Sequence, residues 1–186
     1  FVSRDAMNIE GLSEATLEKF IMNGYIKDFA DLFHLDRYAD EIRQMEGFGD
    51  KSYENLQNSI KNARTTTLPR LVYSLGIPNI GIANAKMICG ALGNDPERIL
   101  NATVEELSEI SGVGGVIAGT FVDYFADEEH RDLFRRLLGE VEIPEEEITE
   151  DSRKFAGVNF VITGSVNHFA NRAEVKEEIE KRGGKV

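Results

Sequence analysis

Apolar residues recur every three or four positions through most of the first 140 residues, which is the period of one face of an α-helix. Leu17, Phe20 and Ile21 form such a face, and Gly24 follows it as a helix stop signal. We therefore expect residues 1–140 to be all α, with helices at 14–22, 50–63, 68–75, 82–92, 115–126 and 128–138, and with further helix starts at Asp95-Pro96 and Thr103.

The pattern changes toward the end of the chain. Residues 141–154 are acidic and contain Pro144, which is typical of a linker. The β-branched and aromatic run at 160–164 then predicts a strand that ends in a turn. An amphipathic helix over 172–182 and the start of a second strand at 183–186 follow. The chain thus divides into an α-helical domain (1–140), a linker (141–154) and a partial α/β segment (155–186).

Four short segments in the helical part resemble one another. Each has an apolar residue shortly before a turn of the form Gly-apolar-Gly, and a helical stretch follows. They are Ile9-Glu10-Gly11-Leu12-Ser13, Met45-Glu46-Gly47-Phe48-Gly49, Ile77-Pro78-Asn79-Ile80-Gly81 and Ile110-Ser111-Gly112-Val113-Gly114. Their first turn residues are 36, 32 and 33 positions apart. This near-constant spacing predicts four helix-turn-helix units in tandem.

Such a turn can bind an anion without a charged side chain. The first N–H groups of a helix have no acceptor within the helix, and the helix dipole makes this end positive. Because the donors are backbone groups, binding would not depend on base sequence. One such turn is more often a simple tight connection, but four in tandem favour a role in binding. The candidate residues are Gly11, Ser13, Gly47, Gly49, Asn79, Gly81, Gly112 and Gly114, with Lys51 and Lys86 just inside the following helices.

The charge distribution bears on the partner. The chain has 21 basic and 33 acidic residues and a net charge of −12, which at face value disfavours a nucleic-acid partner. However, residues 55–94 contain no acid while retaining Lys61, Arg64, Arg70 and Lys86. This acid-free window is either a buried segment that excludes charge or a face that approaches an anion. The basic residues favour the second interpretation.

Few residues suggest catalysis, metal binding or a membrane. No run of 18 apolar residues occurs, no signal peptide is visible, and the chain begins with Phe1, as a piece of a longer protein would. Because Cys89 is the only cysteine in the sequence, no disulfide can form within the chain, which weakly indicates a reducing compartment. With only one cysteine and three dispersed histidines, an ordinary structural zinc site is not expected. We expect surface or packing roles for His34, His130, His168, Asp123 and Cys89.

The four segments resemble helix-hairpin-helix motifs, whose pattern is apolar-x-Gly-apolar-Gly-x-x-x-Ala. Ala85 and Ala118 match the last position, whereas Leu17 and Tyr53 depart from it. The tandem array is similar to that of bacterial NAD-dependent DNA ligases, in the stretches FVSRDAMNIEGL, MEGFGDKS, LVYSLGIPNIG and ISGVGGVIA. The resemblance implies binding of duplex DNA through the minor groove and the phosphates on both sides of a nick.

Residues 155–186 resemble the first part of a BRCT domain, and the resemblance implies a possible phosphate contact at Thr163 and Gly164. The chain lacks a Lys-x-Asp-Gly motif and a four-cysteine zinc module. The fragment is therefore expected to be catalytically inert and to bind no cofactor, with NAD, Mg²⁺ and Zn²⁺ belonging to the parent ligase. The implied partners are double-stranded, nicked DNA and the rest of the ligase chain, in replication and repair, in the bacterial cytoplasm at the nucleoid. The alternatives are a protein-interaction scaffold and a tandem-hairpin part of another repair factor.

Overall fold

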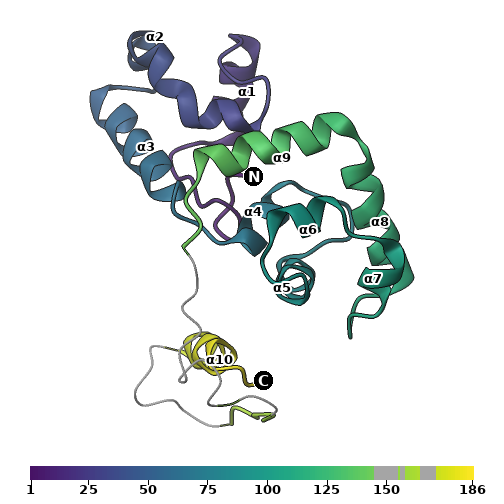
Figure 1. Ribbon diagram of the computed structural model, residues 1–186. Helices are drawn as coiled ribbons and strands as arrows, with labels where there is room; N and C mark the ends of the chain where they lie inside the picture. The colour runs from purple at the N-terminus through teal and green to yellow at the C-terminus, as the bar shows by residue number, and fades with distance from the viewer. Residues whose placement is uncertain (145–154, 156–157, 164–170) are drawn as a thin grey trace. The chain divides into compact units, whose positions relative to one another are not determined.

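The computed structural model describes residues 1–144, 155, 158–163 and 171–186. The chain forms two compact units, Phe1–Pro144 and Glu145–Val186. Between Glu14 and Glu140 the first unit consists of helices joined by short turns. Its elements are α1 (Glu14–Met22), the 3₁₀ helix η1 (Phe29–Tyr38), α2 (Ala39–Gln44), α3 (Asp50–Ala63), α4 (Leu68–Ser74), α5 (Ile82–Ala91), α6 (Pro96–Leu100), α7 (Val104–Ser108), α8 (Gly115–Ala126) and α9 (Glu128–Glu140), shown in Figure 1.

The expected mainly α fold is confirmed, and α1, α3 and α8 begin and end at the predicted residues. The periodicity did not predict η1 and α2, which lie between the first two turns. The first turn also differs from the others, because the residues before it form turns rather than a helix. The remaining three turns each join two helices that pack together, namely α2 with α3, α4 with α5 and α7 with α8.

Side-chain caps define several of the helix starts. The Ser13 hydroxyl accepts a hydrogen bond from the backbone N–H of Thr16 at 3.2 Å, and the Asp95 carboxylate accepts one from Glu97 at 2.9 Å. At Thr103 only half of a capping box forms. Its hydroxyl accepts from the Glu106 N–H at 3.2 Å, but the Glu106 carboxylate accepts from Arg98 at 2.7 Å. These caps fix where the short helices begin.

One continuous hydrophobic core runs through the helical unit. Phe20, Phe121 and Phe134 are its largest fully buried side chains, and each is supplied by a different helix. Phe121 and Phe134 both contact the ring of Phe125, at centroid distances of 5.2 and 5.3 Å. Burial of such aromatic rings contributes most to the stability of a core of this size.

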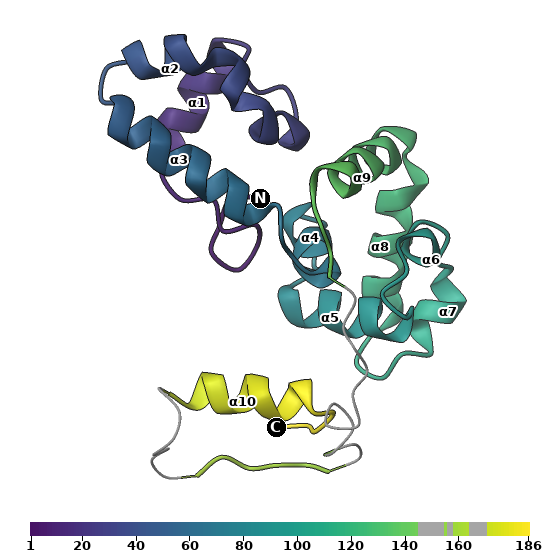
Figure 2. The same cartoon turned by 60° about the vertical axis from the view of Figure 1, so that its left-hand side comes forward.

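Helix α9 connects the two halves of the helical unit, which Figure 2 shows as an α1–α3 part and an α4–α9 part. Leaving α8, it packs against η1, where Arg136 forms a 2.7 Å ion pair with Asp28. Just beyond α9, Glu142 pairs with the segment between α3 and α4. The Glu142 N–H donates to the Arg64 carbonyl, and the Thr66 N–H donates to the Glu142 carbonyl. The segment between α3 and α4, which joins the two halves, is therefore hydrogen-bonded to the chain just beyond α9.

The second unit is described in part. Its helix α10 (Arg172–Lys181) begins at Asn171, whose side chain accepts from the Glu174 N–H at 3.0 Å. Within the described residues, the only bridge of this unit is an isolated parallel one between Asn159, just before the first predicted strand, and Lys185 in the second. Thr163 is exposed, and Gly164 and His168 lie outside the described residues. The BRCT assignment thus stays a prediction.

Candidate nucleic-acid interface

The four repeated turns have the same backbone conformation. Their first residue is left-handed in every case, with φ of +87° at Gly11, +82° at Gly47, +63° at Asn79 and +90° at Gly112. Two residues later the chain is extended, and a helix begins directly after it. Asn79 takes the place of glycine because asparagine tolerates a positive φ better than most residues. The sequence repeat is therefore also a structural repeat.

Three of these turns leave the helix start uncapped. The N-cap residues Gly49, Gly81 and Gly114 have no side chain to offer the first N–H groups of α3, α5 and α8. Ser13 differs, because its hydroxyl already accepts from Thr16. In each turn the N-cap carbonyl accepts the first helical hydrogen bond, as in the 2.9 Å bond from Ala85 to Gly81. The uncapped N–H groups are what an oxyanion would bind.

Buried side chains hold the turns in place. The middle residues Ile80 and Val113 are 6% and 4% exposed, whereas Leu12 and Phe48 are half-buried against the core. Ala85 and Ala118, the last positions of the motif, are fully buried. By contrast, the eight candidate turn residues are all exposed: Gly11, Ser13, Gly47, Gly49, Asn79, Gly81, Gly112 and Gly114. Each turn is thus anchored from inside and open to a ligand outside.

Two of the turns lie against the helix that follows another turn. A Cβ atom placed on Gly11 would lie 3.9 Å from the Leu56 Cβ of α3, and the Glu10 N–H donates to the Ser59 hydroxyl at 2.7 Å. A Cβ atom placed on Gly112 would lie 3.1 Å from the Met87 sulfur of α5. The first turn is therefore adjacent to the helix of the second, and the fourth turn is adjacent to the helix of the third.

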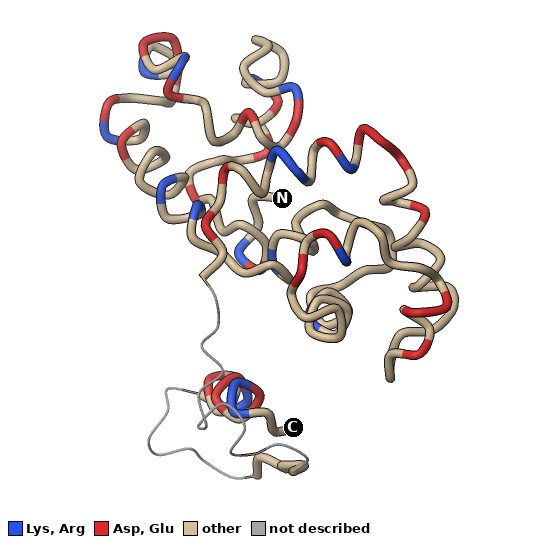
Figure 3. Tube along the Cα trace, viewed as in Figure 1, with Lys and Arg blue, Asp and Glu red and all other residues tan. Residues whose placement is uncertain are grey.

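The basic residues proposed for DNA contact fall into two groups. Lys51, Lys61 and Lys86 are exposed and form no ion pair with any described residue. In Figure 3 the tube of α4 and α5 carries no acidic residue, although red positions occur on the surrounding helices. These three lysines are free to approach a phosphate.

Arg64 and Arg70 instead bind backbone within the chain. Arg70 donates to the carbonyls of Ala6 and Arg4, at 2.9 and 2.6 Å. Arg64 donates to the Phe33 carbonyl at 2.8 Å and to the Glu140 carbonyl and carboxylate, each at 2.9 Å. Contacts of Arg64 and Arg70 with DNA stay a prediction.

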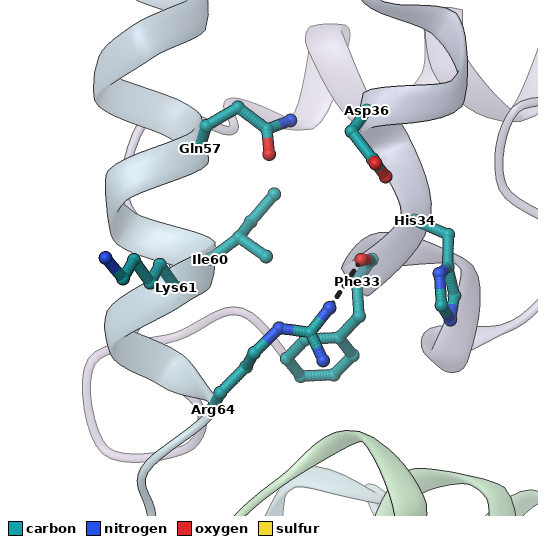
Figure 4. Close-up of a pocket in the computed structure, with 7 residues that line it drawn as sticks. All are labelled: Phe33, His34, Asp36, Gln57, Ile60, Lys61 and Arg64. Atoms are coloured by element: carbon teal, nitrogen blue, oxygen red, sulfur yellow. Dashed lines mark hydrogen bonds between the residues drawn. The ribbon is translucent and has the colours of Figure 1, made fainter.

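Arg64, His34 and Glu140 form a cluster of paired side chains, called here the Arg64 cluster. It borders a pocket of about 200 Å³ between α3 and η1, lined by Phe33, His34, Asp36, Gln57, Ile60, Lys61 and Arg64 (Figure 4). In this view Lys61 points away from the other side chains, and Arg64 reaches the Phe33 carbonyl. The His34 Nε2 atom contacts the Glu140 carboxylate. Burial alone would raise the pKa of Glu140. The hydrogen bonds from Arg64 and His34 outweigh the effect of burial, and the pKa of Glu140 lies below its ordinary value. The cluster therefore joins η1, α3 and α9.

The other singled-out residues have packing or surface positions. Cys89 is fully buried, and burial raises the pKa of its thiol to about 12. His130 stacks on Tyr124 with a centroid distance of 3.9 Å, and Asp123 is exposed. Within residues 1–144 and the described part of 155–186, no three potential ligands gather into a metal site, and no helix could cross a membrane.

Two features of this surface were not visible in the sequence. Arg4 is exposed, and the bond from Arg70 to its carbonyl places it beside the acid-free window. Ser59 ties the first turn to α3, a contact between positions 49 residues apart. Neither contact could be predicted from local sequence patterns, since both depend on how distant segments pack.

Comparison with known proteins supports this description. Residues 70–134, which include the third and fourth turns, match the helix-hairpin-helix motif family. The whole chain aligns with DNA ligases from Lachnoclostridium phytofermentans (54% identity), Ruminiclostridium cellulolyticum (50%) and Thermosipho africanus (40%). This chain is similar, from end to end, to a segment of DNA ligases. It spans 28% of the length of each of these three relatives, so their activity belongs to a longer protein.

Proposed function

We propose that this chain is a DNA-binding segment of a DNA ligase and that it holds duplex DNA by the sugar-phosphate backbone. The observation that carries the proposal is the fourfold repeat of one exposed, left-handed turn, three copies of which leave a helix start without a cap. Backbone N–H donors at such positions suit phosphate oxygens and carry no base preference. The match to the helix-hairpin-helix family supports the same function.

The finer parts of the proposal concern the parent enzyme. It would be the NAD-dependent, bacterial type that seals nicks in replication and repair, with NAD, Mg²⁺ and Zn²⁺ used outside this segment. The substrate would be nicked duplex DNA in the cytoplasm, and residues 155–186 would begin a BRCT domain with Thr163 and Gly164 near a phosphate. The similarity to DNA ligases over the full chain supports a ligase as the parent protein, on which these further proposals depend.

Affinity for a duplex as a function of salt tests the function. If several phosphates are neutralised, log K falls linearly with log[salt], with a slope of about −0.9 for each phosphate. Binding should be equal for duplexes of different sequence. Absence of binding at low salt, or affinity that salt does not change, would contradict the proposal.

A matched pair of glycine variants tests the turns themselves. Gly81 and Gly90 are both exposed, neither has a positive φ, and neither has an atom within 4 Å of a Cβ placed on it. Gly81→Leu covers the third turn, whereas Gly90→Leu adds the same side chain farther along α5. We expect Gly81→Leu to weaken DNA binding about tenfold or more, a loss of about 1.4 kcal/mol. Gly90→Leu should bind as the unaltered chain does, and equal losses would show that the turn is not a contact.

A further inference from the structure

The four repeated turns are divided between the two halves of the helical unit. The first and second turns belong to the α1–α3 part, and the third and fourth belong to the α4–α9 part. Within the first half, the bond from Glu10 to Ser59 ties the first turn to α3. Within the second half, Gly112 of the fourth turn lies close to Met87 of α5. The relative position of the two pairs of turns is therefore set where the halves meet.

Glu140, at the end of α9, joins the two halves through its side chain. Helix α9 packs against η1, which is the main helix-to-helix contact between the two parts. The Glu140 carboxylate pairs with His34 of η1 and with Arg64, the residue that ends α3. Only Thr65 and Thr66 then lie between Arg64 and the N-cap of α4. One carboxylate thus connects three helices at the point where the chain passes from one half to the other.

The first residues of the chain also connect the halves. The ring of Phe1 stacks on that of Phe29 in η1, at a centroid distance of 4.6 Å. Arg70 of α4 donates to the carbonyls of Ala6 and Arg4, at 2.9 and 2.6 Å. The beginning of the helical unit is therefore bound to both parts, as its end is through Glu140.

We propose that Glu140 is a positioning residue for duplex binding, which holds the two pairs of turns in the orientation that lets both reach one duplex. This role rests on the proposed function. The carboxylate is anionic, 19% exposed and already paired, so it is not itself a phosphate ligand. Two linked sites gain affinity for one molecule only when their geometry allows both to bind it together. When the Arg64 cluster is weakened, a smaller fraction of the chain has that geometry, and the apparent Kd rises in inverse proportion to the fraction.

The sign of a charge effect tests this role. Glu140→Gln and Glu142→Gln change the net charge equally, and Glu142 is exposed without an ion pair to a described residue. Charge alone would make both variants bind an anionic duplex slightly more tightly. In the full chain, at a temperature where circular dichroism shows both variants folded, we expect Glu140→Gln to bind a duplex of about 20 base pairs about fivefold more weakly. Glu142→Gln should bind it no more weakly than the unaltered chain.

Duplex length separates positioning from a loss of stability. A DNA hairpin with a stem of about five base pairs, half a helical turn, is short enough to meet one half of the unit at a time. Its affinity at low salt should be the same for Glu140→Gln and the unaltered chain, because each pair of turns is intact. Partial unfolding would instead weaken the binding of both DNAs equally. Ile99→Val, a change in the buried core of α6, is the stability control and should leave the ratio of the two affinities unchanged.

A milder variant keeps the test informative if Glu140→Gln does not fold. His34→Gln removes one of the two partners of Glu140 and should give the same dependence on duplex length. Pulsed EPR measures the orientation without DNA, using spin labels at Lys19→Cys in α1 and Glu105→Cys in α7, both exposed positions, while Cys89 is fully buried. Glu140→Gln should broaden the distribution of distances between the labels, and Glu142→Gln should not.

Three results would each overturn the role of Glu140. They are equal affinities of Glu140→Gln and Glu142→Gln for the long duplex, equal losses for the long and short DNAs, and a distance distribution that Glu140→Gln leaves unchanged. The proposed function would fail differently, with the unaltered chain binding neither DNA.

Discussion

Replacing Glu140 by glutamine should destabilise the helical unit by removing the charge that joins its two halves. The Glu140 side chain is 19% exposed and accepts hydrogen bonds from Arg64 and His34. A hydrogen bond to a charged group contributes about 1.5–3 kcal/mol. Because Arg64 and His34 are 38% and 33% exposed, water replaces part of what they lose. We therefore expect a loss near the lower end, about 2 kcal/mol for the cluster.

Urea unfolding, monitored by circular dichroism, measures this loss of stability. A loss of this size corresponds to a melting temperature lower by about 4–8 °C. Glu142→Gln is the matched control, since Glu142 is exposed and has no ion pair with a described residue. Its free energy of unfolding should change by less than about 0.5 kcal/mol. Equal effects of the two substitutions would refute the reasoning.

The same contacts make the loss depend on pH. The pKa of Glu140 is lower in the folded chain than its ordinary value of 4.5. Its stabilisation is therefore fully present above that ordinary value and is lost as the pH falls through the folded pKa. The difference between the unaltered chain and Glu140→Gln should be constant near pH 7 and should shrink in unfolding curves recorded at acidic pH. A difference that does not shrink would mean that the carboxylate charge is not what stabilises the cluster.

Three further changes have defined outcomes. Gly112→Ala should lower the free energy of unfolding by about 1–3 kcal/mol, because φ is +90° at this position and the Met87 side chain is close. Gly114→Ala should have little effect, and thermal melting compares the two variants. Cys89 should not react with iodoacetamide at pH 8 until urea unfolds the chain, because burial raises its pKa to about 12; mass spectrometry detects the adduct. Ser13→Ala should cost about 1 kcal/mol in urea unfolding, since it removes the cap of α1.

The helix positions could be predicted because each helix repeats its apolar residues and begins at a recognisable signal. The Asp95 carboxylate and the Thr103 hydroxyl both cap the helices that they were expected to start. The segment at 29–44 could not be read in this way. Its 3₁₀ helix contains a non-helical residue at His34, and a break of this kind interrupts the 3.6-residue period.

The turns of the candidate interface were also visible in the sequence, but the roles of their glycines were only partly so. The first position of each turn has a positive φ and so requires glycine or asparagine. The third position, the N-cap, is extended in all four turns, and any residue could adopt that conformation. Glycine there leaves the helix start uncapped and open. Similarly, Arg64 and Arg70 resemble the free lysines in sequence, and only packing shows that they bind distant carbonyls.

The contacts between the end of α9 and the segment after α3 have a consequence for the order of folding. The Arg64–Glu140 bonds close a loop of 76 residues, whereas each helical hairpin forms from neighbouring residues. Closing a long loop costs more chain entropy than forming a hairpin, so contacts of this range form late. We expect the hairpins to assemble before the end of α9 docks. Weakening that docking should then speed unfolding while leaving the folding rate almost unchanged.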